Sequence, residues 1–353
     1  MTPQPVTQAA AADDILKVRE LRKLYPVLRR GLFRSRRIGT IRAVDGISFS
    51  VRRGETLGLV GESGCGKTTA ARAILHLIEP TSGSVQLGGT DLTEVFRKAD
   101  RAQALSARRR LQYVFQDPYL SLNPRWTIAQ TLTEPLRVHR QVPPDQWNRR
   151  VVELLDLVGL EAYHAWRYPH EFSGGQRQRV GIARALAVNP EVVICDEPVS
   201  SLDVSVRAQI LNLLADLRDS LRLTYLYISH DLSSVRFIST RVAVMYLGQI
   251  VEIADVDSLF ERPRHHYSYA LLKAIPVPDP DTSAADTVLK GEVPSAMNVP
   301  PGCRFHPRCP AALPICATVV PALEQVPDRD HAVACHNPRS DQAIVRHTSG
   351  AIA

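Results

Sequence analysis

The stretch that decides the fold is GESGCGKTT, residues 61–69. It fits the pattern G-x-x-x-x-G-K-[ST], in which glycines let backbone N–H groups curl around phosphates without Cβ clashes. Lys67 is expected to neutralise phosphate charge, and the Thr68 hydroxyl to bind Mg²⁺. The apolar TLGLV before the loop and KTTAARAILHLI at its end give the strand–loop–helix context of a nucleotide site in an α/β domain. The residues expected at the nucleotide are Gly61, Glu62, Ser63, Gly64, Cys65, Gly66, Lys67, Thr68 and Thr69.

A second apolar strand supplies carboxylates. The stretch EVVICDEP, residues 191–198, predicts a core strand that ends in Asp196 and Glu197. Asp196 is expected to reach the Mg²⁺ shell, usually through water. Glu197 can polarise an attacking water as a general base. A strand that ends in an acid means little alone, but together with the glycine loop it indicates a nucleotide triphosphatase.

The rest of the chain up to about Asp255 alternates short β-rich runs with helical stretches, which is typical of an α/β domain. In residues 205–221, apolar residues recur every three or four positions and predict an amphipathic helix. Residues 224–231 predict an apolar strand that leads to His230, and residues 241–255 predict two strands with a turn near Gly248.

A second helix start lies in EFSGGQRQR, residues 171–179. Ser173 can cap a helix, and Gly174 and Gly175 leave N–H groups exposed, so this terminus also attracts anions. The stretch FSGGQ resembles the signature loop of ATP-binding-cassette (ABC) ATPases, usually written LSGGQ, with Phe172 in the leucine position.

Other cassette elements follow in the expected order over residues 15–260. Tyr25 matches the aromatic residue that stacks on adenine, although a core tyrosine is the alternative. Gln116 in YVFQDP matches the Q-loop glutamine, and SSLDVS matches the D-loop with Asp203. His230 in YISHD matches the switch histidine at the γ-phosphate, although a lone histidine at a strand end is more often structural.

The resemblance implies the cassette fold and a composite active site. The fold would have a RecA-like core sheet, an antiparallel β subdomain and a helical subdomain at about residues 118–186. The Ser173 loop of one subunit would cap ATP on the glycine loop of a second ABC ATPase subunit, a paralogue rather than a second copy. The implied catalytic residues are Glu197, His230, Lys67 and Gln116, the Mg²⁺ ligands are Thr68, Gln116 and Asp196, and Ser173, Gly174, Gly175, Gln176 and Asp203 join the nucleotide site.

The C-terminal part changes in composition, because prolines multiply after Ser258 and four of the six cysteines lie there. Cys303, Cys309, Cys316 and Cys335 resemble the tail of oligopeptide/dipeptide-type ABC importers. That resemblance implies a [4Fe–4S] cluster, with Zn²⁺ and unliganded or disulfide-bonded cysteines as alternatives. The expected divisions are a disordered N-terminus at 1–14, a nucleotide-binding domain at 15–260, the extension at 261–338 and a loose tail at 339–353.

Two isolated cysteines have simpler interpretations. Cys65 is expected to fill space in the glycine loop, although the positive loop could lower its pKa and make it oxidisable. Cys195 is expected to be a small buried apolar residue.

The composition of the 353 residues limits the partners that we expect. The net charge of +7 is compatible with anionic ligands or membranes. The Arg-rich stretch from Arg29 to Arg42 is expected to be a solvated loop, with lipid headgroups or an acidic partner as alternatives. Its single aromatic residue, Phe33, does not make the interleaved pattern that stacks bases, so nucleic acid is not an expected partner.

No secretory signal or membrane span is visible, so we expect a peripheral subunit on the cytoplasmic face of the membrane. The implied function is an ATPase that energises peptide import together with two permease subunits and a solute-binding protein. The alternative is a non-transport ABC ATPase of nucleic-acid repair or translation.

Overall fold

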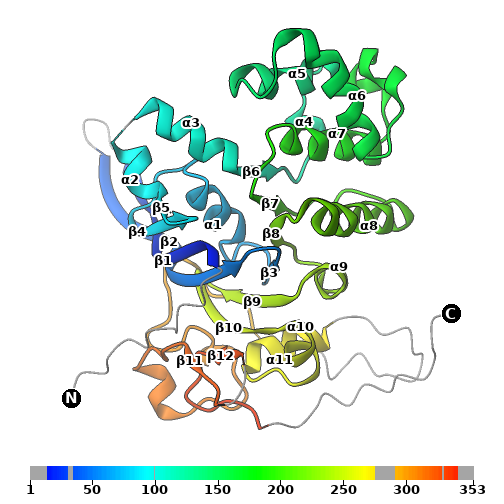
Figure 1. Cartoon of the computed structure of the whole chain (residues 1–353). Helices are drawn as coiled ribbons and strands as arrows, with labels where there is room; N and C mark the ends of the chain where they lie inside the picture. Colours follow the sequence, from blue (N-terminus) through cyan, green and yellow to red (C-terminus); the bar gives the residue numbers. More distant parts are fainter. Residues whose placement is uncertain (1–13, 31–34, 99, 275–290, 328–329, 341–353) are drawn as a thin grey trace, which may run out of the picture.

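The computed structural model describes residues 14–30, 35–98, 100–274, 291–327 and 330–340 (Figure 1). Of the disordered N-terminus expected at residues 1–14, residues 1–13 lie outside the described residues, as does most of the loose tail expected at 339–353, whereas Asp14 already belongs to strand β1. The described chain has two sheets with helices packed around them, as expected for an α/β fold (Figure 1).

The larger sheet has eight strands in the order β11-β12-β10-β9-β3-β8-β7-β6. Strands β6, β7, β8, β3 and β9 are parallel, whereas β10, β12 and β11 pair antiparallel at one edge. Because the carboxyl ends of parallel strands lie at one edge, the residues that follow β3, β6, β7 and β8 gather there. The bounds are β3 Thr56–Val60, β6 Leu111–Val114, β7 Val192–Asp196, β8 Thr224–Ile228, β9 Arg241–Tyr246, β10 Gln249–Asp255, β11 Glu324–Gln325 and β12 His331–Val333.

Both faces of this sheet are buried. On β7, Val193 and Cys195 belong to one hydrophobic cluster, while Val192 and Ile194 belong to another on the opposite face. Continuous apolar runs are therefore needed in these strands, and this explains why the sequence does not alternate there. Cys195 is fully buried, as expected of a small apolar residue.

The smaller sheet is antiparallel and has the order β2-β1-β4-β5. Its strands are β1 Asp14–Arg30, β2 Ser35–Arg52, β4 Ser82–Leu87 and β5 Thr90–Asp91. The expectation of a loop over the Arg-rich stretch is wrong, because the backbone of β1 pairs with that of β2 as far as Arg30 and Ser35. Exposed arginines such as Arg37 and Arg42 do not prevent such pairing, since the ladder uses backbone groups. Of that stretch, residues 31–34 lie outside the described part.

Helices occupy the remaining layers, and α4 to α7 form a separate helical lobe beside the end of β6 (Figure 1). The predicted amphipathic helix is α8, which buries Ile210, Leu214 and Leu217. The helices are α1 Lys67–Ile74, α2 Leu92–Arg97, α3 Arg101–Arg110, α4 Pro118–Ser121, α5 Ile128–Val138, α6 Trp147–Leu157, α7 Gly174–Leu186, α8 Val204–Leu221, α9 Leu232–Ile238, α10 Val256–Glu261 and α11 His266–Lys273. Short 3₁₀ turns are η1 Pro144–Gln146, η2 Ala162–Trp166, η3 Pro169–Glu171, η5 His306–Arg308 and η6 Pro314–Ala317.

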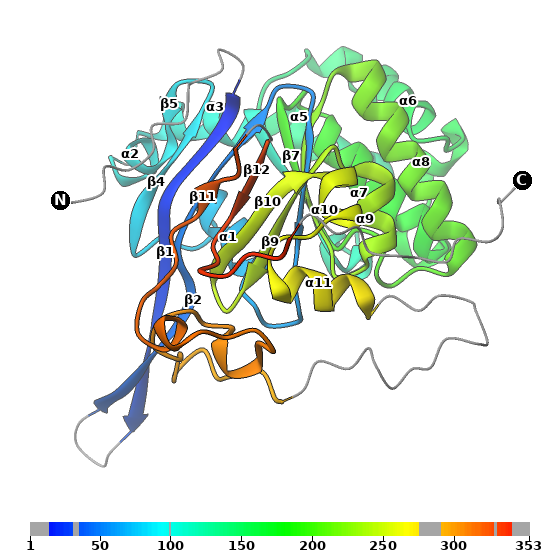
Figure 2. The same ribbon diagram turned by 90° about the horizontal axis from the view of Figure 1, so that it is seen from below.

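The C-terminal region packs against the body of the protein. Strand β12 pairs antiparallel with β10, and Figure 2 shows the two side by side. A buried pair fixes this strand: His331 Nε2 lies 2.6 Å from Oε1 of Glu252 on β10. The region thus extends the central sheet. No helix in the described ranges is both long and apolar enough to cross a membrane.

Candidate functional site

The glycine loop follows β3 and leads into α1. Gly61 and Gly66 have φ angles of 155° and 111°. A Cβ atom would lie 2.2 Å from the Met245 carbonyl oxygen at Gly61, and 2.1 Å from the Ala43 carbonyl oxygen at Gly66. Both positions therefore require glycine for conformation and for space, and the loop can present backbone N–H groups to a phosphate.

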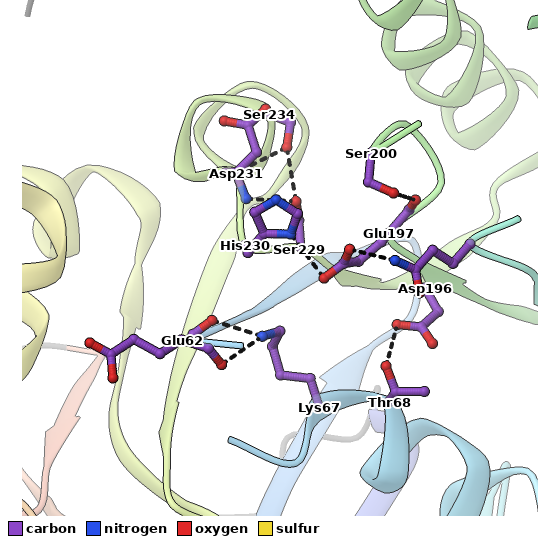
Figure 3. A network of polar contacts seen from close by, with 12 residues as sticks. Glu62, Lys67, Thr68, Asp196, Glu197, Ser200, Ser229, His230, Asp231 and Ser234 are labelled. Carbon is purple, nitrogen blue, oxygen red and sulfur yellow. Dashed lines mark hydrogen bonds and ion pairs between the residues drawn. The ribbon is translucent and has the colours of Figure 1, made fainter. Parts of the chain in front are cut away.

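The two functional side chains at the start of α1 lie at this loop (Figure 3). Lys67 is buried, and its Nζ donates to the carbonyl oxygens of Gly61 at 2.7 Å and Glu62 at 3.2 Å. The Thr68 hydroxyl donates to Oδ1 of Asp196 at 3.2 Å. The structure thus brings the end of β7 to the start of α1.

Asp196 is almost completely buried and accepts a second hydrogen bond, from the Tyr113 hydroxyl at 2.5 Å. Burial raises the pKa of this carboxyl, against the opposing effect of the hydrogen bonds from Tyr113 and Thr68. A hydroxyl and a carboxylate beside a phosphate loop are hard oxygen donors, so the pair fits Mg²⁺. Nothing in the sequence singles out Tyr113, because a tyrosine in a core strand is ordinary.

Glu197 and His230 meet beyond the ends of β7 and β8 (Figure 3), and Gln116, which follows β6, contacts Glu197. Oε1 of Glu197 lies 2.9 Å from Nδ1 of His230, and Oε2 accepts from Nε2 of Gln116 at 3.0 Å. Glu197 has φ of 48°, and its N–H donates to the Ile228 carbonyl oxygen at 2.8 Å. This left-handed turn carries Glu197 away from Asp196.

The turn that carries His230 is also held by hydrogen bonds. Asp231 accepts from the Ser233 N–H at the start of α9 and pairs with Arg207 at 3.3 Å. The Ser229 hydroxyl accepts from the Asp231 N–H at 3.0 Å. His230 itself is half-exposed and free to reach a ligand.

The second helix start begins α7. The Ser173 hydroxyl accepts from the Gln176 N–H at 3.3 Å, and Oε1 of Gln176 accepts from the Ser173 N–H at 3.0 Å. This is a capping box. A Cβ at Gly175 would lie 2.3 Å from Cγ1 of Val206. Helices α7 and α1 begin in different parts of the molecule (Figure 1), and among the described residues no hydrogen bond joins these two starts.

Tyr25 and Asp203 lie outside the cluster around Glu197. Tyr25 is 37% exposed on β1, so it is a surface tyrosine rather than a core one. Asp203 precedes α8 but makes no side-chain cap to that helix. Their contacts with a nucleotide are still predictions.

Two alternatives for the cysteines do not hold. Cys65 is buried, as expected of a residue that fills space, and burial raises the pKa of its thiol instead of the loop lowering it. All six cysteines are free, which excludes the disulfide alternative in this structure. Burial also raises the pKa of Cys303, Cys309 and Cys335.

The predicted metal centre gains no support from the geometry. Within the described ranges, no three or more His, Cys, Asp or Glu side chains come close enough to hold a metal ion. The cysteines do approach one another, because the Cys303 N–H donates to the Cys316 carbonyl oxygen at 2.8 Å.

Three features define the class of protein as an ABC-type P-loop ATPase. They are the phosphate loop, the glutamate beyond a core strand and the separate capped helix start. The chain belongs to the ABC transporter family, whose model matches residues 44–200. A second model, for the C-terminal region of oligopeptide/dipeptide transporters, matches residues 251–316.

Similar proteins align with most of the length of this chain. The oligopeptide transport ATP-binding protein AppF of Bacillus subtilis (strain 168) is 50% identical over 330 residues, which are 93% of this chain and 98% of AppF. The probable peptide ABC transporter ATP-binding protein y4tS of Sinorhizobium fredii is 51% identical over 92% of this chain and 90% of its own length.

Solved structures match the fold. The ATP-binding cassette MJ0796, a dimer bound to ADP and phosphate, has a TM-score of 0.59 at 28% identity and covers 68% of this chain and 98% of its own. The cassette cbiO1 of Clostridium perfringens, part of the ABC transporter complex cbiONQ, has a TM-score of 0.58 at 27% identity, over 70% of this chain and 91% of its own.

Proposed function

We propose that this chain is the ATPase subunit that energises import of peptides, or of similarly small solutes, by an ABC transporter. The observation that carries the proposal is the glutamate–histidine–glutamine cluster at the phosphate loop, in a chain half identical to oligopeptide transport ATP-binding proteins. The relatives' names support transport over the alternative in repair or translation.

In the proposed mechanism, Glu197 accepts a proton from water while the water oxygen bonds to the γ-phosphorus of ATP and the bond to ADP breaks. Lys67, His230 and the helix start of the partner subunit that corresponds to the Ser173 loop stabilise the negative charge on the phosphate. Mg²⁺, when bound at Thr68, Asp196 and Gln116, supplies further positive charge. Tyr25 stacks on the adenine, and Asp203 lies at the subunit contact.

The proposed partners follow from the two separate anion-binding helix starts. Each start supplies half of a site, so a second ABC ATPase subunit completes it, a paralogue rather than a second copy. Two permease subunits dock through their cytoplasmic helices in the groove beside Gln116, where Phe115 and Tyr119 are exposed. A solute-binding protein delivers the cargo, and the chain lies peripherally on the cytoplasmic face of the membrane.

The proposed domain division is a nucleotide-binding domain at residues 15–260, with its helical subdomain at about 118–186, and an extension at 261–338. In the extension, the four cysteines are proposed to hold a structural [4Fe–4S] cluster, with Zn²⁺ as the alternative. Their spacing supports this proposal, and the described geometry does not. Iron, sulfide and zinc analysis tests it: metal lost in Cys316→Ser supports it, and folded metal-free protein with four titratable thiols excludes it.

The function is tested by co-expression with candidate permease subunits. We expect the chain to co-purify with them and to hydrolyse ATP faster in that complex than alone. Glu197→Gln should abolish the stimulation, whereas the matched control Glu261→Gln, an exposed glutamate on α10, should not. Stable dimers of the isolated wild-type chain with rapid, permease-independent turnover would contradict the transport function.

A further inference from the structure

Residues Arg304–Arg308, the RFHPR segment, lie far from the glycine loop in sequence and contact it in the structure. We propose that this segment positions two walls of the ATP site, so that ATP affinity depends on the C-terminal region. The inference rests on the proposed function only in taking ATP as the ligand of residues 61–69.

The first contact is an ion pair between Arg308 and Glu62, the second residue of the loop. Nη1 of Arg308 lies 3.0 Å from Oε2 of Glu62, and Nη2 lies 3.2 Å from Oε1. The side chains are 5% and 23% exposed, so little solvent screens the pair. A bidentate arginine–carboxylate pair fixes orientation as well as distance.

The backbone of Glu62 is held as well. Its N–H donates to the Tyr267 hydroxyl of α11 at 2.9 Å. The ring of Phe305, within the RFHPR segment, packs on Tyr267 and on Tyr246, with centroids 5.4 Å apart in both cases. All three rings are buried. Glu62 is therefore fixed at its main chain and its side chain by residues outside the loop.

The second contact reaches the hairpin that carries Tyr25. Arg304 is buried, pairs with Asp45 of β2 and donates to the Leu247 carbonyl oxygen. The Asp45 N–H donates to the Gly248 carbonyl oxygen at 2.8 Å. Two positions before Asp45, the Ala43 carbonyl oxygen limits the space at Gly66 of the loop. One short segment thus contacts both the phosphate loop and the strand beside it.

The charge of Glu62 gives the contact a direct effect on ATP. A carboxylate next to the phosphate loop repels a polyanionic ligand, and the guanidinium of Arg308 neutralises it at close range. Loss of Arg308 would leave that charge uncompensated and free the Glu62 side chain. Both effects weaken nucleotide binding and leave the group that activates water, Glu197, in place.

The experiment measures the Kd of the full-length chain for a fluorescent ATP analogue, and the KM and kcat of its ATPase. We expect Arg308→Gln to raise Kd and KM about tenfold, a typical coupling between sites, with kcat nearly unchanged. Adding Glu62→Gln to Arg308→Gln should recover part of the affinity, because it removes the uncompensated charge but does not restore the bidentate contact.

The matched control is Asp330→Asn. Oδ2 of Asp330, in the C-terminal region, accepts a hydrogen bond from Nη2 of Arg52 on β2 at 2.5 Å. This contact lies near the start of β3, whereas the glycine loop follows the end of β3. It should bind ATP like wild type. Thermal melting shows whether Arg308→Gln is folded. If the folded variant also binds the ATP analogue with the Kd of wild type, the proposal is wrong.

If Arg308→Gln does not fold, Arg308→Lys tests the proposal in its place. It keeps the charge but cannot pair through two N–H groups, so an unchanged Kd would overturn the positioning role and a raised Kd would support it. Failure of wild type itself to bind ATP would instead overturn the proposed function.

Discussion

Nδ1 of His230 lies 2.9 Å from Oε1 of Glu197, across the ends of two neighbouring parallel strands. The contact orients the carboxylate from one side, while Gln116 holds it from the other. Since the two partners use different oxygens, the carboxylate plane is fixed. A general base held in this way does not have to change its side-chain rotamer before it accepts a proton.

Glu197→Gln should lower kcat for ATP hydrolysis by about 10²- to 10⁴-fold, the usual contribution of a general base. The amide is isosteric and still contacts Gln116 and His230, so ATP affinity should change little. Steady-state turnover and Kd measured on one preparation check this. An active Glu197→Gln enzyme would show that another group activates the water.

Tyr113→Phe should raise the Mg²⁺ concentration needed for half-maximal ATPase activity several-fold. The lost hydrogen bond favours the ionised form of Asp196, so its pKa would rise further and the carboxylate would hold the cation less well. At saturating Mg²⁺, kcat should approach the wild-type value.

Tyr225→Phe is the control for that experiment, because the buried Tyr225 hydroxyl has no hydrogen-bond partner among the described residues. It should leave the Mg²⁺ titration unchanged. Identical titrations for Tyr113→Phe and wild type would show that the Tyr113 contact does not tune the site.

The free energy of unfolding should decrease as the pH is lowered below neutrality, because His265 is buried in its neutral form. Burial lowers the pKa of this imidazole to about 4, against the opposing charge of Glu252. Above the unfolded-state pKa of about 6.5, both states are neutral at this site. Between about 6.5 and 4 only the unfolded chain takes up the proton, so the free energy of unfolding should drop by about 3 kcal/mol over that range.

Urea unfolding at several pH values tests this, with His265→Asn as the comparison. Nδ1 of His265 accepts from the Tyr267 N–H at the start of α11, and asparagine can replace that cap without titrating. The variant should lose pH dependence between about 6.5 and 4 relative to wild type. Parallel curves for the two proteins would contradict the assignment.

Gly181→Ala should stabilise the fold by about 0.5–1 kcal/mol, because alanine favours a helix interior over glycine. Gly181 lies inside α7, and an added Cβ would meet no atom within 4 Å. Thermal or urea unfolding measures the gain, and ATPase activity should be unchanged. A loss of stability would mean that α7 needs glycine for packing.

The motif residues were predictable because each follows a strand whose apolar run is visible in the sequence. Asp196, Glu197 and His230 lie where parallel strands end, and that topology brings them together. Tyr113 was not predictable, since its partner Asp196 lies 83 residues away and no local pattern records the contact. Leu221 fitted the helical repeat of α8 but is 44% exposed, because it ends the helix.

The C-terminal region was the least predictable part. Prolines disfavour long helices and central strands there, but composition cannot show that β12 joins β10 or that Arg308 reaches Glu62. The Arg-rich stretch was misjudged for a related reason, since its charge describes the exposed side chains and not the backbone pairing.

The 246-residue separation of Arg308 from Glu62 has a consequence for biosynthesis. At about 5–20 residues per second, a ribosome needs roughly 12–50 s to make the stretch between them. During that interval the nascent chain carries a glycine loop without its arginine. Full nucleotide affinity would then arise only near the end of translation, and a chain truncated before residue 304 would leave the ribosome impaired in ATP binding while keeping every cassette motif.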